Sequence, residues 1–337
     1  MSVNLLTIVV YHFVRPLGES QFPKLVSLDL QRFEDQLAYL ANFYEVVHPN
    51  EVMRSIQEGT PLPGNAALLT FDDGYKDHLS HVFPRLKRYG WSALFFPPSA
   101  PILNRELLDV NRIHFVLASL ADKTALVNLI ERHILDATSE FALNPISSYR
   151  AELRTPSRFD EADVAYCKRL LQHALPEPLR LRIARELFSE FVSTDEKDFA
   201  NELYLSLEDL RVLREGGMEV GSHGHHHYWL GKTESEKQKT DIDQSLKLLQ
   251  TIGVSTKNFW FCYPYGSYNE ATLQLLKERS CGAAVTTVTN LANLKDSNPL
   301  LLPRLDTNDL PQVKESEANH WTHQIAGVQN GISDSPD

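Results

Sequence analysis

Two carboxylates stand next to each other at the end of an apolar run. The run Ala66–Phe71 has the pattern of a buried strand, and Asp72 and Asp73 follow it directly. Adjacent carboxylates repel, and a cation resolves the conflict, because one carboxylate can bind a metal while the other stays free as a base. Gly74 then allows a sharp backbone turn. A solvated turn or a helix cap is the alternative, since Asp-Asp-Gly is common in turns.

A cluster of four histidines in five positions is the second candidate. The segment Gly221–His227 (GSHGHHH) follows a short strand expected at Met218–Val220, so it also begins at a strand end. The i, i+4 spacing of His223 and His227 predicts that both lie on one side of a helical turn. Neutral imidazoles are the commonest ligands of zinc-like metals. A solvated polar loop is the alternative, which a lone histidine would favour and this cluster does not.

Two imidazoles and one carboxylate form a three-ligand set that leaves one coordination position open for water. A metal held in this way lowers the pKa of its water to near neutral, and a free carboxylate nearby accepts the proton. The sequence therefore predicts a hydrolytic metal site that combines the aspartate pair with His223 and His227.

A turn rich in tyrosine is the third candidate. The segment Phe261–Asn269 (FCYPYGSYN) begins within a strand expected at Phe259–Tyr263. Aromatic rings suit the apolar face of a sugar, and their hydroxyl groups bind its polar edge. We therefore regard Tyr263, Pro264 and Tyr265 as candidate substrate-binding residues. A turn packed by aromatic side chains is the alternative.

The rest of the chain must position these segments. Strand and helix patterns alternate up to about residue 102 and again from about residue 203, which predicts an α/β fold with a parallel sheet, as a barrel or an open sheet. Between them the strand patterns vanish. We predict an α/β domain of residues 1–102 and 203–310, a helical insertion of residues 103–202 and a polar C-terminal tail of residues 311–337.

Composition excludes several classes of protein. The 337 residues are 42% hydrophobic and 23% charged, as in an ordinary globular protein. The net charge of −11, without a basic stripe, argues against a nucleic-acid or anionic-membrane partner. The three cysteines (Cys167, Cys262 and Cys281) match no zinc ribbon or CxxC motif, which fits buried thiols in a reducing compartment.

The N-terminus lacks the basic segment of a signal peptide, and its apolar run Leu5–Val10 is short enough for a first strand. No stretch approaches the roughly 18 apolar residues of a transmembrane segment. If Met1 is the native start, the expected location is cytoplasmic.

In their order along the chain, three motifs resemble those of the polysaccharide deacetylases, carbohydrate esterase family 4, with a NodB-like domain. Thr70–Gly74 (TFDDG) resembles the first motif, Glu219–His227 the second, written H-[ST]-x-x-H, and Phe261–Gly266 the third, in its F-x-Y-P-Y-G form. The resemblance covers about residues 5–100 and 203–306. It implies a distorted (β/α) barrel with the site at the C-terminal ends of its strands.

The resemblance also implies a role for each matched residue. Asp72 would be the general base, Asp73, His223 and His227 would hold the metal, and the backbone N–H of Tyr265 would help bind the oxyanion. Zinc is the metal expected first, although nickel or cobalt would satisfy the same ligands. The implied reaction is hydrolysis of the amide of an N-acetylated sugar, with release of acetate.

The chain departs from the family pattern in three places. Position 224 is Gly where Ser or Thr is usual, the third motif lacks the Arg that commonly pairs with the base, and no Leu-x-His motif appears near the C-terminus. Tyr11–His12 resembles the Tyr-His of the poly-N-acetylglucosamine deacetylase branch, so His12 is our candidate acid, with a core or supporting histidine as the alternative. Arg304 is a candidate either to orient Asp72 or to contact substrate.

Two other functions stay open. A deacylase or deformylase of a lipid-linked or nucleotide-linked sugar would keep the metal and change the bond, and a cytoplasmic enzyme reaches such precursors. A non-catalytic carbohydrate-binding protein would fit the absent Arg and C-terminal His, but the intact Asp72, Asp73, His223 and His227 argue against it. The helical insertion would serve as a lid over a small substrate or as the surface of a homo-oligomer.

Overall fold

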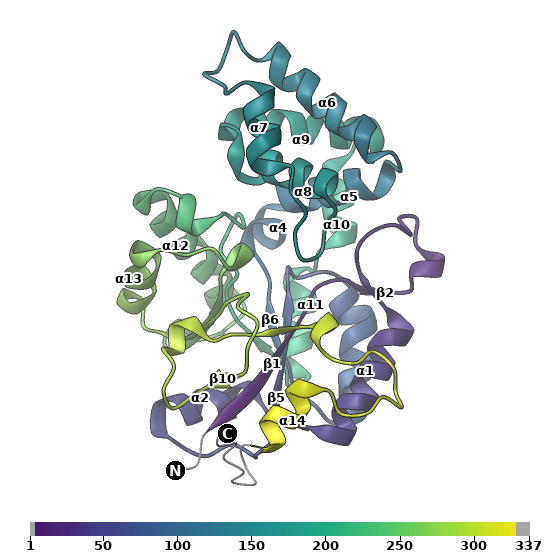
Figure 1. Cartoon of the computed structure of the whole chain (residues 1–337). Coiled ribbons are helices and arrows are strands. Elements are labelled where there is room, and N and C mark those ends of the chain that lie inside the picture. Colours follow the sequence, from purple (N-terminus) through teal and green to yellow (C-terminus); the bar gives the residue numbers. More distant parts are fainter. Residues whose placement is uncertain (1–3, 328–337) are drawn as a thin grey trace, which may run out of the picture. The chain divides into compact units, whose positions relative to one another are not determined.

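The computed structural model describes residues 4–327, and the chain divides into two compact units (Figure 1). The larger unit comprises Met1–Leu17, Ser27–Asn104 and Asn201–Asp337, and the smaller one comprises Gly18–Val26 and Arg105–Ala200. The predicted domain boundary assigned Gly18–Val26 to the barrel, whereas the structure groups it with the helical residues.

Parallel strands in the larger unit close into a ring. β1 pairs with β5, β5 with β6, and β6 with β7, all in parallel. Parallel bridges continue the ring from Ser222 to Phe261 in β8, and from Val285 in β9 to Leu302, before β11 pairs with β1. This circuit is a distorted (β/α) barrel, which confirms the predicted fold. Its strands are β1 (Leu5–Tyr11), β5 (Ala66–Asp72), β6 (Leu94–Phe96), β7 (Glu219–Val220), β8 (Phe259–Cys262), β9 (Cys281–Val285) and β11 (Leu305–Asp306).

Alternate residues of β5 pack on opposite sides of the ring. Leu69 and Phe71 belong to the cluster that includes the surrounding helices, whereas Leu68 belongs to a second cluster with inward-facing residues of the other ring strands. Burial on both faces explains why β5 is apolar from Ala66 to Leu69 and why every one of its residues is buried. Because side chains alternate along a strand, Asp72 shares the inward face with Leu68 and Thr70.

Helices pack around the ring. The first helical segment after β5 begins as a π-helix, His78–Val82, and continues as α3. Strand β6 then begins at Leu94. The helices of this unit are α1 (Leu30–Phe43), α2 (Pro49–Glu58), α3 (Phe83–Tyr89), α4 (Ser99–Asn104), α11 (Leu207–Glu215), α12 (Ser235–Thr251), α13 (Glu270–Glu278) and α14 (His320–Gly327).

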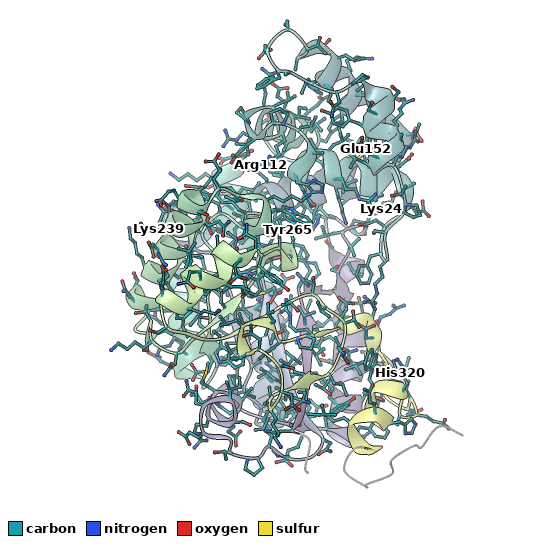
Figure 2. The ribbon with its side chains drawn as sticks, turned by 60° about the vertical axis from the view of Figure 1, so that its left-hand side comes forward. Lys24, Arg112, Glu152, Lys239, Tyr265 and His320 are labelled. Atoms are coloured by element: carbon teal, nitrogen blue, oxygen red, sulfur yellow. The ribbon has the colours of Figure 1, made fainter. Side chains whose placement is uncertain are left out.

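Helix α14 corrects the prediction of a polar tail from residue 311. Its first residue, His320, is exposed (Figure 2), but Ile325 is only 1% exposed. The hydroxyl of Thr322 lies 2.7 Å from those of Tyr39 and Tyr44, so the helix is attached to α1. An amphipathic segment this short carried too weak a periodic signal to be recognised. The remainder of the predicted tail, residues 328–337, lies outside the described residues.

The smaller unit is helical. Its core includes Ile113, Leu126 and Leu187, and Arg112 binds Glu196 and Asp109 in a network that is largely buried. Among residues 4–327, no helix combines the length and hydropathy that crossing a bilayer requires. The helices of this unit are α5 (Asp109–Ser119), α6 (Lys123–Asp136), α7 (Ile146–Leu153), α8 (Ala162–Arg169), α9 (Glu177–Phe191) and, as far as Ala200, α10 (Glu196–Leu203).

Candidate metal centre and active site

The backbone directs the two adjacent aspartates to different places. Asp72 is the last residue of β5, and Asp73 has a left-handed backbone with φ +71°. The amide of Asp73 donates to the Phe96 carbonyl at 3.0 Å, which fixes this turn against β6. Gly74 is also left-handed, with φ +66°, and a Cβ there would lie 2.7 Å from the Cβ of Pro97. The turn therefore requires glycine for its space as well as for its φ angle.

The histidine segment is an irregular loop, and the predicted helical turn was wrong. Two of its residues are left-handed, Gly224 with φ +71° and His227 with φ +58°. A buried carboxylate holds the loop from α12: Asp241 accepts hydrogen bonds from the amides of His225 at 2.9 Å and His226 at 2.8 Å. A Cβ at position 224 would lie 2.7 Å from Asp241 Oδ2, which explains why glycine stands where the family pattern has Ser or Thr.

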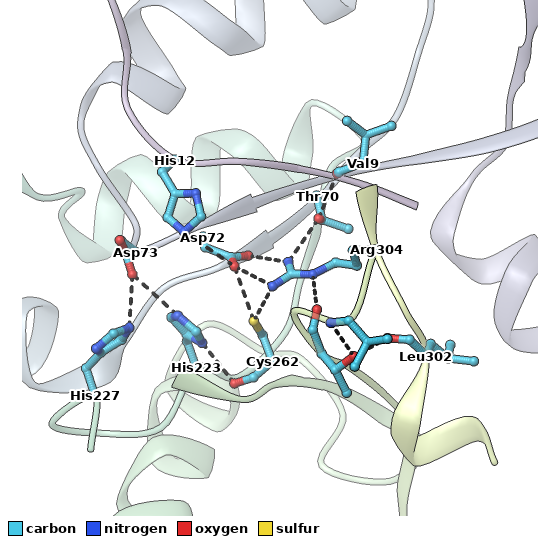
Figure 3. Close-up of polar contacts among 12 residues, drawn as sticks. Val9, His12, Thr70, Asp72, Asp73, His223, His227, Cys262, Leu302 and Arg304 are labelled. Carbon is cyan, nitrogen blue, oxygen red and sulfur yellow. Dashed lines mark hydrogen bonds and ion pairs between the residues drawn. The ribbon is translucent and has the colours of Figure 1, made fainter. Parts of the chain in front are cut away.

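Asp73, His223 and His227 nevertheless converge (Figure 3). Asp73 Oδ1 lies 3.4 Å from His223 Nε2 and 3.3 Å from His227 Nε2, and all three side chains are buried. Ligands bound tetrahedrally to an ion at about 2.0–2.1 Å stand about 3.3–3.4 Å apart. Among the described residues, Asp73 Oδ1 has no hydrogen-bond partner. The three residues therefore fit a small tetrahedral metal ion.

The second ring nitrogen of His223 is fixed by the backbone. Nδ1 donates to the carbonyl of Cys262 at 2.8 Å, which leaves Nε2 as the nitrogen that faces Asp73. Metal-binding histidines commonly use such a bond to fix the tautomer and the ring orientation. Burial by itself would raise the pKa of Asp73, but the imidazoles of His223 and His227 that face Oδ1 outweigh it and hold that pKa well below its usual range.

Asp72 is paired with an arginine from the opposite end of the chain. Arg304 donates from Nη1 to Oδ1 at 2.9 Å and from Nη2 to Oδ2 at 2.8 Å, and both side chains are 2% exposed. Burial tends to raise the pKa of Asp72, but the guanidinium outweighs it and holds the pKa at about 2. Arg304 also donates to the Thr286 carbonyl at 2.9 Å. This geometry favours the orienting role foreseen for Arg304, since so buried a side chain has little surface for substrate.

A second group of potential ligands, Asp72, His223 and Cys262, differs from the first. The thiol of Cys262 lies 3.3 Å from Asp72 Oδ2 and 3.2 Å from Arg304 Nη2. The guanidinium therefore already provides a positive charge between the carboxylate and the thiol. This group does not fit a metal as well as the first one does.

His12 follows β1 and stands beside this carboxylate. Its Nε2 lies 4.0 Å from Asp72 Oδ2, and half of its side chain is exposed. Its carbonyl accepts a hydrogen bond at 2.9 Å from Nε2 of the buried His78, which fixes the backbone at this point. His12 thus combines proximity to Asp72 with access to solvent.

Comparisons with known proteins identify relatives of part of the sequence and of the fold. Residues 192–283 match the family model of the polysaccharide deacetylases. The matched segment contains the histidine cluster and the tyrosine-rich turn, so this part of the chain is similar to that family.

The curated relatives match over short segments. The poly-beta-1,6-N-acetyl-D-glucosamine N-deacetylase of Escherichia coli K12 is 34% identical over 80 residues, which are 23% of this chain and 12% of that protein. The putative polysaccharide deacetylase YxkH of Bacillus subtilis is 30% identical over 92 residues, which are 27% of this chain and 31% of that protein.

Solved structures match nearly the whole chain at low identity. IcaB from Ammonifex degensii has a TM-score of 0.55 at 18% identity, with 97% of both chains covered. The Streptococcus pyogenes deacetylase PplD, in complex with acetate, has a TM-score of 0.55 at 16% identity, with 90% of this chain and 92% of that chain covered. At this identity the likeness shows that the fold is shared.

The tyrosine-rich third motif contributes differently from what its tyrosines suggested. Tyr263 is 1% exposed and donates its hydroxyl to the Leu300 carbonyl at 2.9 Å, and Pro264 is also buried. Their predicted contact with sugar is therefore wrong, because both side chains pack inside the fold. Tyr265 is only half-buried and left-handed at φ +57°. Its ring stacks on that of Trp229, with centroids 4.5 Å apart, and meets the His227 ring edge-on (Tyr265 is labelled in Figure 2).

Sequence reasoning missed Asp241, Trp229, Tyr75 and the placement of Cys262. Cys262 could have been found, because it alternates with Trp260 on the inward face of β8, just as Asp72 does on β5. Asp241 had no such signal, since one acid in a polar helix usually faces solvent. Tyr75 lies just beyond the first motif and donates to Asp73 Oδ2 at 2.7 Å, a contact that only the folded turn creates.

Proposed function

We propose that this chain is a zinc-dependent hydrolase that removes acetyl groups from an N-acetylated amino sugar within a glycan. The main support is the geometry of Asp73. Its Oδ1 lies as far from the imidazoles of His223 and His227 as two ligands of a tetrahedral metal ion lie from each other. The neighbouring carboxylate, Asp72, is already paired with Arg304. The relative from E. coli, by its name, acts on poly-beta-1,6-N-acetyl-D-glucosamine. A β-1,6-linked N-acetylglucosamine oligomer is therefore the first substrate to test.

Asp73, His223 and His227 would hold the metal. When bound there, the metal would polarise the acetyl carbonyl and lower the pKa of a water molecule. Asp72 would accept the proton of that water as it attacks the carbonyl carbon. Arg304 keeps Asp72 ionised, with a pKa of about 2, and holds both of its oxygens in place.

The remaining steps need an oxyanion donor and an acid. The backbone N–H of Tyr265, in the tight turn Pro264–Gly266, would donate to the developing oxyanion. His12 stands near Asp72 with half its surface exposed, so it would give its proton to the leaving nitrogen as the amide C–N bond breaks. The products are acetate and a free amine. The stacked rings of Tyr265 and Trp229 would support the sugar beside His227.

Acetate release tests the proposal. The protein is stripped with a chelator, reloaded with zinc, and given N-acetylglucosamine oligomers, an N-formyl analogue and nucleotide-linked and lipid-linked N-acetyl sugars. We expect acetate from the oligomers, only with metal, and none from the matched Asp73→Asn variant. Tight glycan binding by the zinc-loaded protein without release of acetate would contradict the proposal and support a carbohydrate-binding protein. Release of acyl groups from the linked monosaccharides alone would overturn the glycan assignment.

A further inference from the structure

Tyr75 stands directly behind the proposed metal ligand Asp73. It follows Gly74 in the left-handed turn, its side chain is fully buried, and its hydroxyl donates to Asp73 Oδ2 at 2.7 Å. A hydrogen bond from a hydroxyl to a carboxylate is charge-assisted and therefore stronger than a neutral one. Tyr75 thus engages one of the two oxygens of Asp73 without being a ligand itself.

The ring of Tyr75 has little freedom to move. It stacks on Phe13 with centroids 3.6 Å apart and planes 14° apart, and Tyr204 lies parallel to it at 6.1 Å. The backbone is pinned as well, because Tyr75 forms an antiparallel bridge with Tyr204, and the amide of Leu205 donates to the Gly74 carbonyl at 2.9 Å. The hydroxyl is therefore presented from a fixed position.

The two oxygens of Asp73 have opposite surroundings as a result. Oδ2 accepts from Tyr75, whereas Oδ1 faces the Nε2 atoms of His223 and His227 and has no hydrogen-bond partner among residues 4–327. A bidentate carboxylate must direct both oxygens to the same ion. The Tyr75 hydroxyl opposes that arrangement, because a bidentate rotation would break its bond to Oδ2.

We infer that Tyr75 is a positioning residue that makes Asp73 a monodentate ligand and so favours a small four-coordinate ion. Zinc binds in this way, whereas larger ions such as calcium take carboxylates in bidentate fashion and accept more ligands. The inference rests on the proposed function, because it requires that Asp73, His223 and His227 hold the metal. In this inference Tyr75, which does not itself bind the metal, contributes to the selectivity for zinc.

The test compares Tyr75→Phe with a matched control, Tyr166→Phe. Tyr166 is also fully buried and donates its hydroxyl to a carboxylate, Glu131, at 3.1 Å, but it lies in the smaller unit. Both variants lose one buried hydroxyl bond to a carboxylate, so both should show a similar fall in melting temperature. Zinc and manganese dissociation constants of the stripped full-length proteins are measured by chelator competition, together with the visible absorption of bound cobalt.

We expect Tyr75→Phe to weaken zinc binding about tenfold or more, the usual effect of losing a partner behind a metal ligand. Its preference for zinc over manganese should narrow, and its cobalt absorption should fall as the coordination number rises. Tyr166→Phe should match the wild type in all three readouts, which a merely structural effect of lost stability would not produce.

Two results would overturn the inference while leaving the proposed function intact. One is a folded Tyr75→Phe protein with the zinc affinity, selectivity and cobalt spectrum of the wild type. The other needs no variant: a structure of the zinc-loaded wild type in which both oxygens of Asp73 bind the ion. A wild-type protein that binds no divalent metal would overturn the proposed function and the inference together.

Discussion

Asp72 and Asp73 are neighbours in the chain, yet their carboxylates lie in opposite surroundings. Asp72 points into the ring of strands, where Arg304 binds both of its oxygens. Asp73 is turned away by its left-handed backbone and faces two imidazoles with one oxygen that no described residue satisfies. The protein thus provides its own cation, Arg304, for Asp72, whereas Asp73 would receive its cation in the form of the proposed metal ion. This difference underlies the two proposed roles, with Asp72 as the general base and Asp73 as a metal ligand.

Exchanging each aspartate for asparagine should separate these two roles, and we expect the largest effect here. Asp73→Asn removes the charge that faces the histidines, so zinc binding and turnover should both be lost. Asp72→Asn should keep zinc and lose turnover by about 10²–10⁴-fold, the range for a general base. Zinc content by mass spectrometry of metals and acetate release check the two outcomes. An Asp72→Asn protein with wild-type turnover would show that the base is assigned wrongly.

The second-largest effect should come from replacing Arg304, which should change the pKa of Asp72. The guanidinium lowers the pKa of Asp72 to about 2, so its loss must raise that pKa, by about 1 to 3 units for a close opposite charge. Asp72 is active when ionised, so the acidic limb of the pH profile of kcat/KM should move to higher pH. Arg304→Met should move it further than Arg304→Lys, which keeps the charge. An unmoved acidic limb in both folded variants would argue that Arg304 does not act through Asp72.

His12 tests the acid side of the same pair. We expect His12→Gln to slow turnover about 10²-fold, the lower end of the range for general acid catalysis, with zinc affinity unchanged. Acetate release and zinc affinity by chelator competition check the two outcomes. His48, which caps α2 and does not belong to the proposed site, provides the control His48→Asn. If His12→Gln lowered zinc affinity instead, a role in supporting the metal site would replace that of the acid.

The smallest effect should come from the support of the histidine loop. Asp241→Asn keeps the size of the side chain but weakens its bonds to the amides of His225 and His226. We expect zinc affinity to fall about tenfold, because partners that orient metal ligands usually contribute that much. The control is Asp243→Asn on the same helix, whose carboxylate is half exposed and pairs with Arg279. Equal zinc affinities in the two variants would show that Asp241 does not support the metal site.

The fold was largely predictable because buried strands and helices have recognisable local patterns of apolar residues. β5 begins with four apolar residues because both of its faces are covered, and the helices α1 and α12 have one buried side. Helix α14 escaped because eight residues carry too little pattern. The assignment of Gly18–Val26 to the smaller unit escaped for another reason: contacts between segments far apart in sequence decide it.

The sequence by itself determined the types of residue that could do chemistry: two adjacent carboxylates after a strand, a histidine cluster after another, and an arginine near the end of the chain. Only the tertiary structure decided which of these residues contact one another. Arg304 reaches Asp72 across the ring, Asp241 shapes a loop that is not a helical turn, and Tyr75 engages one oxygen of Asp73. Strand alternation and left-handed turns set these directions. Asp72 and Arg304 lie 232 residues apart in the chain, so no local pattern could record their pairing.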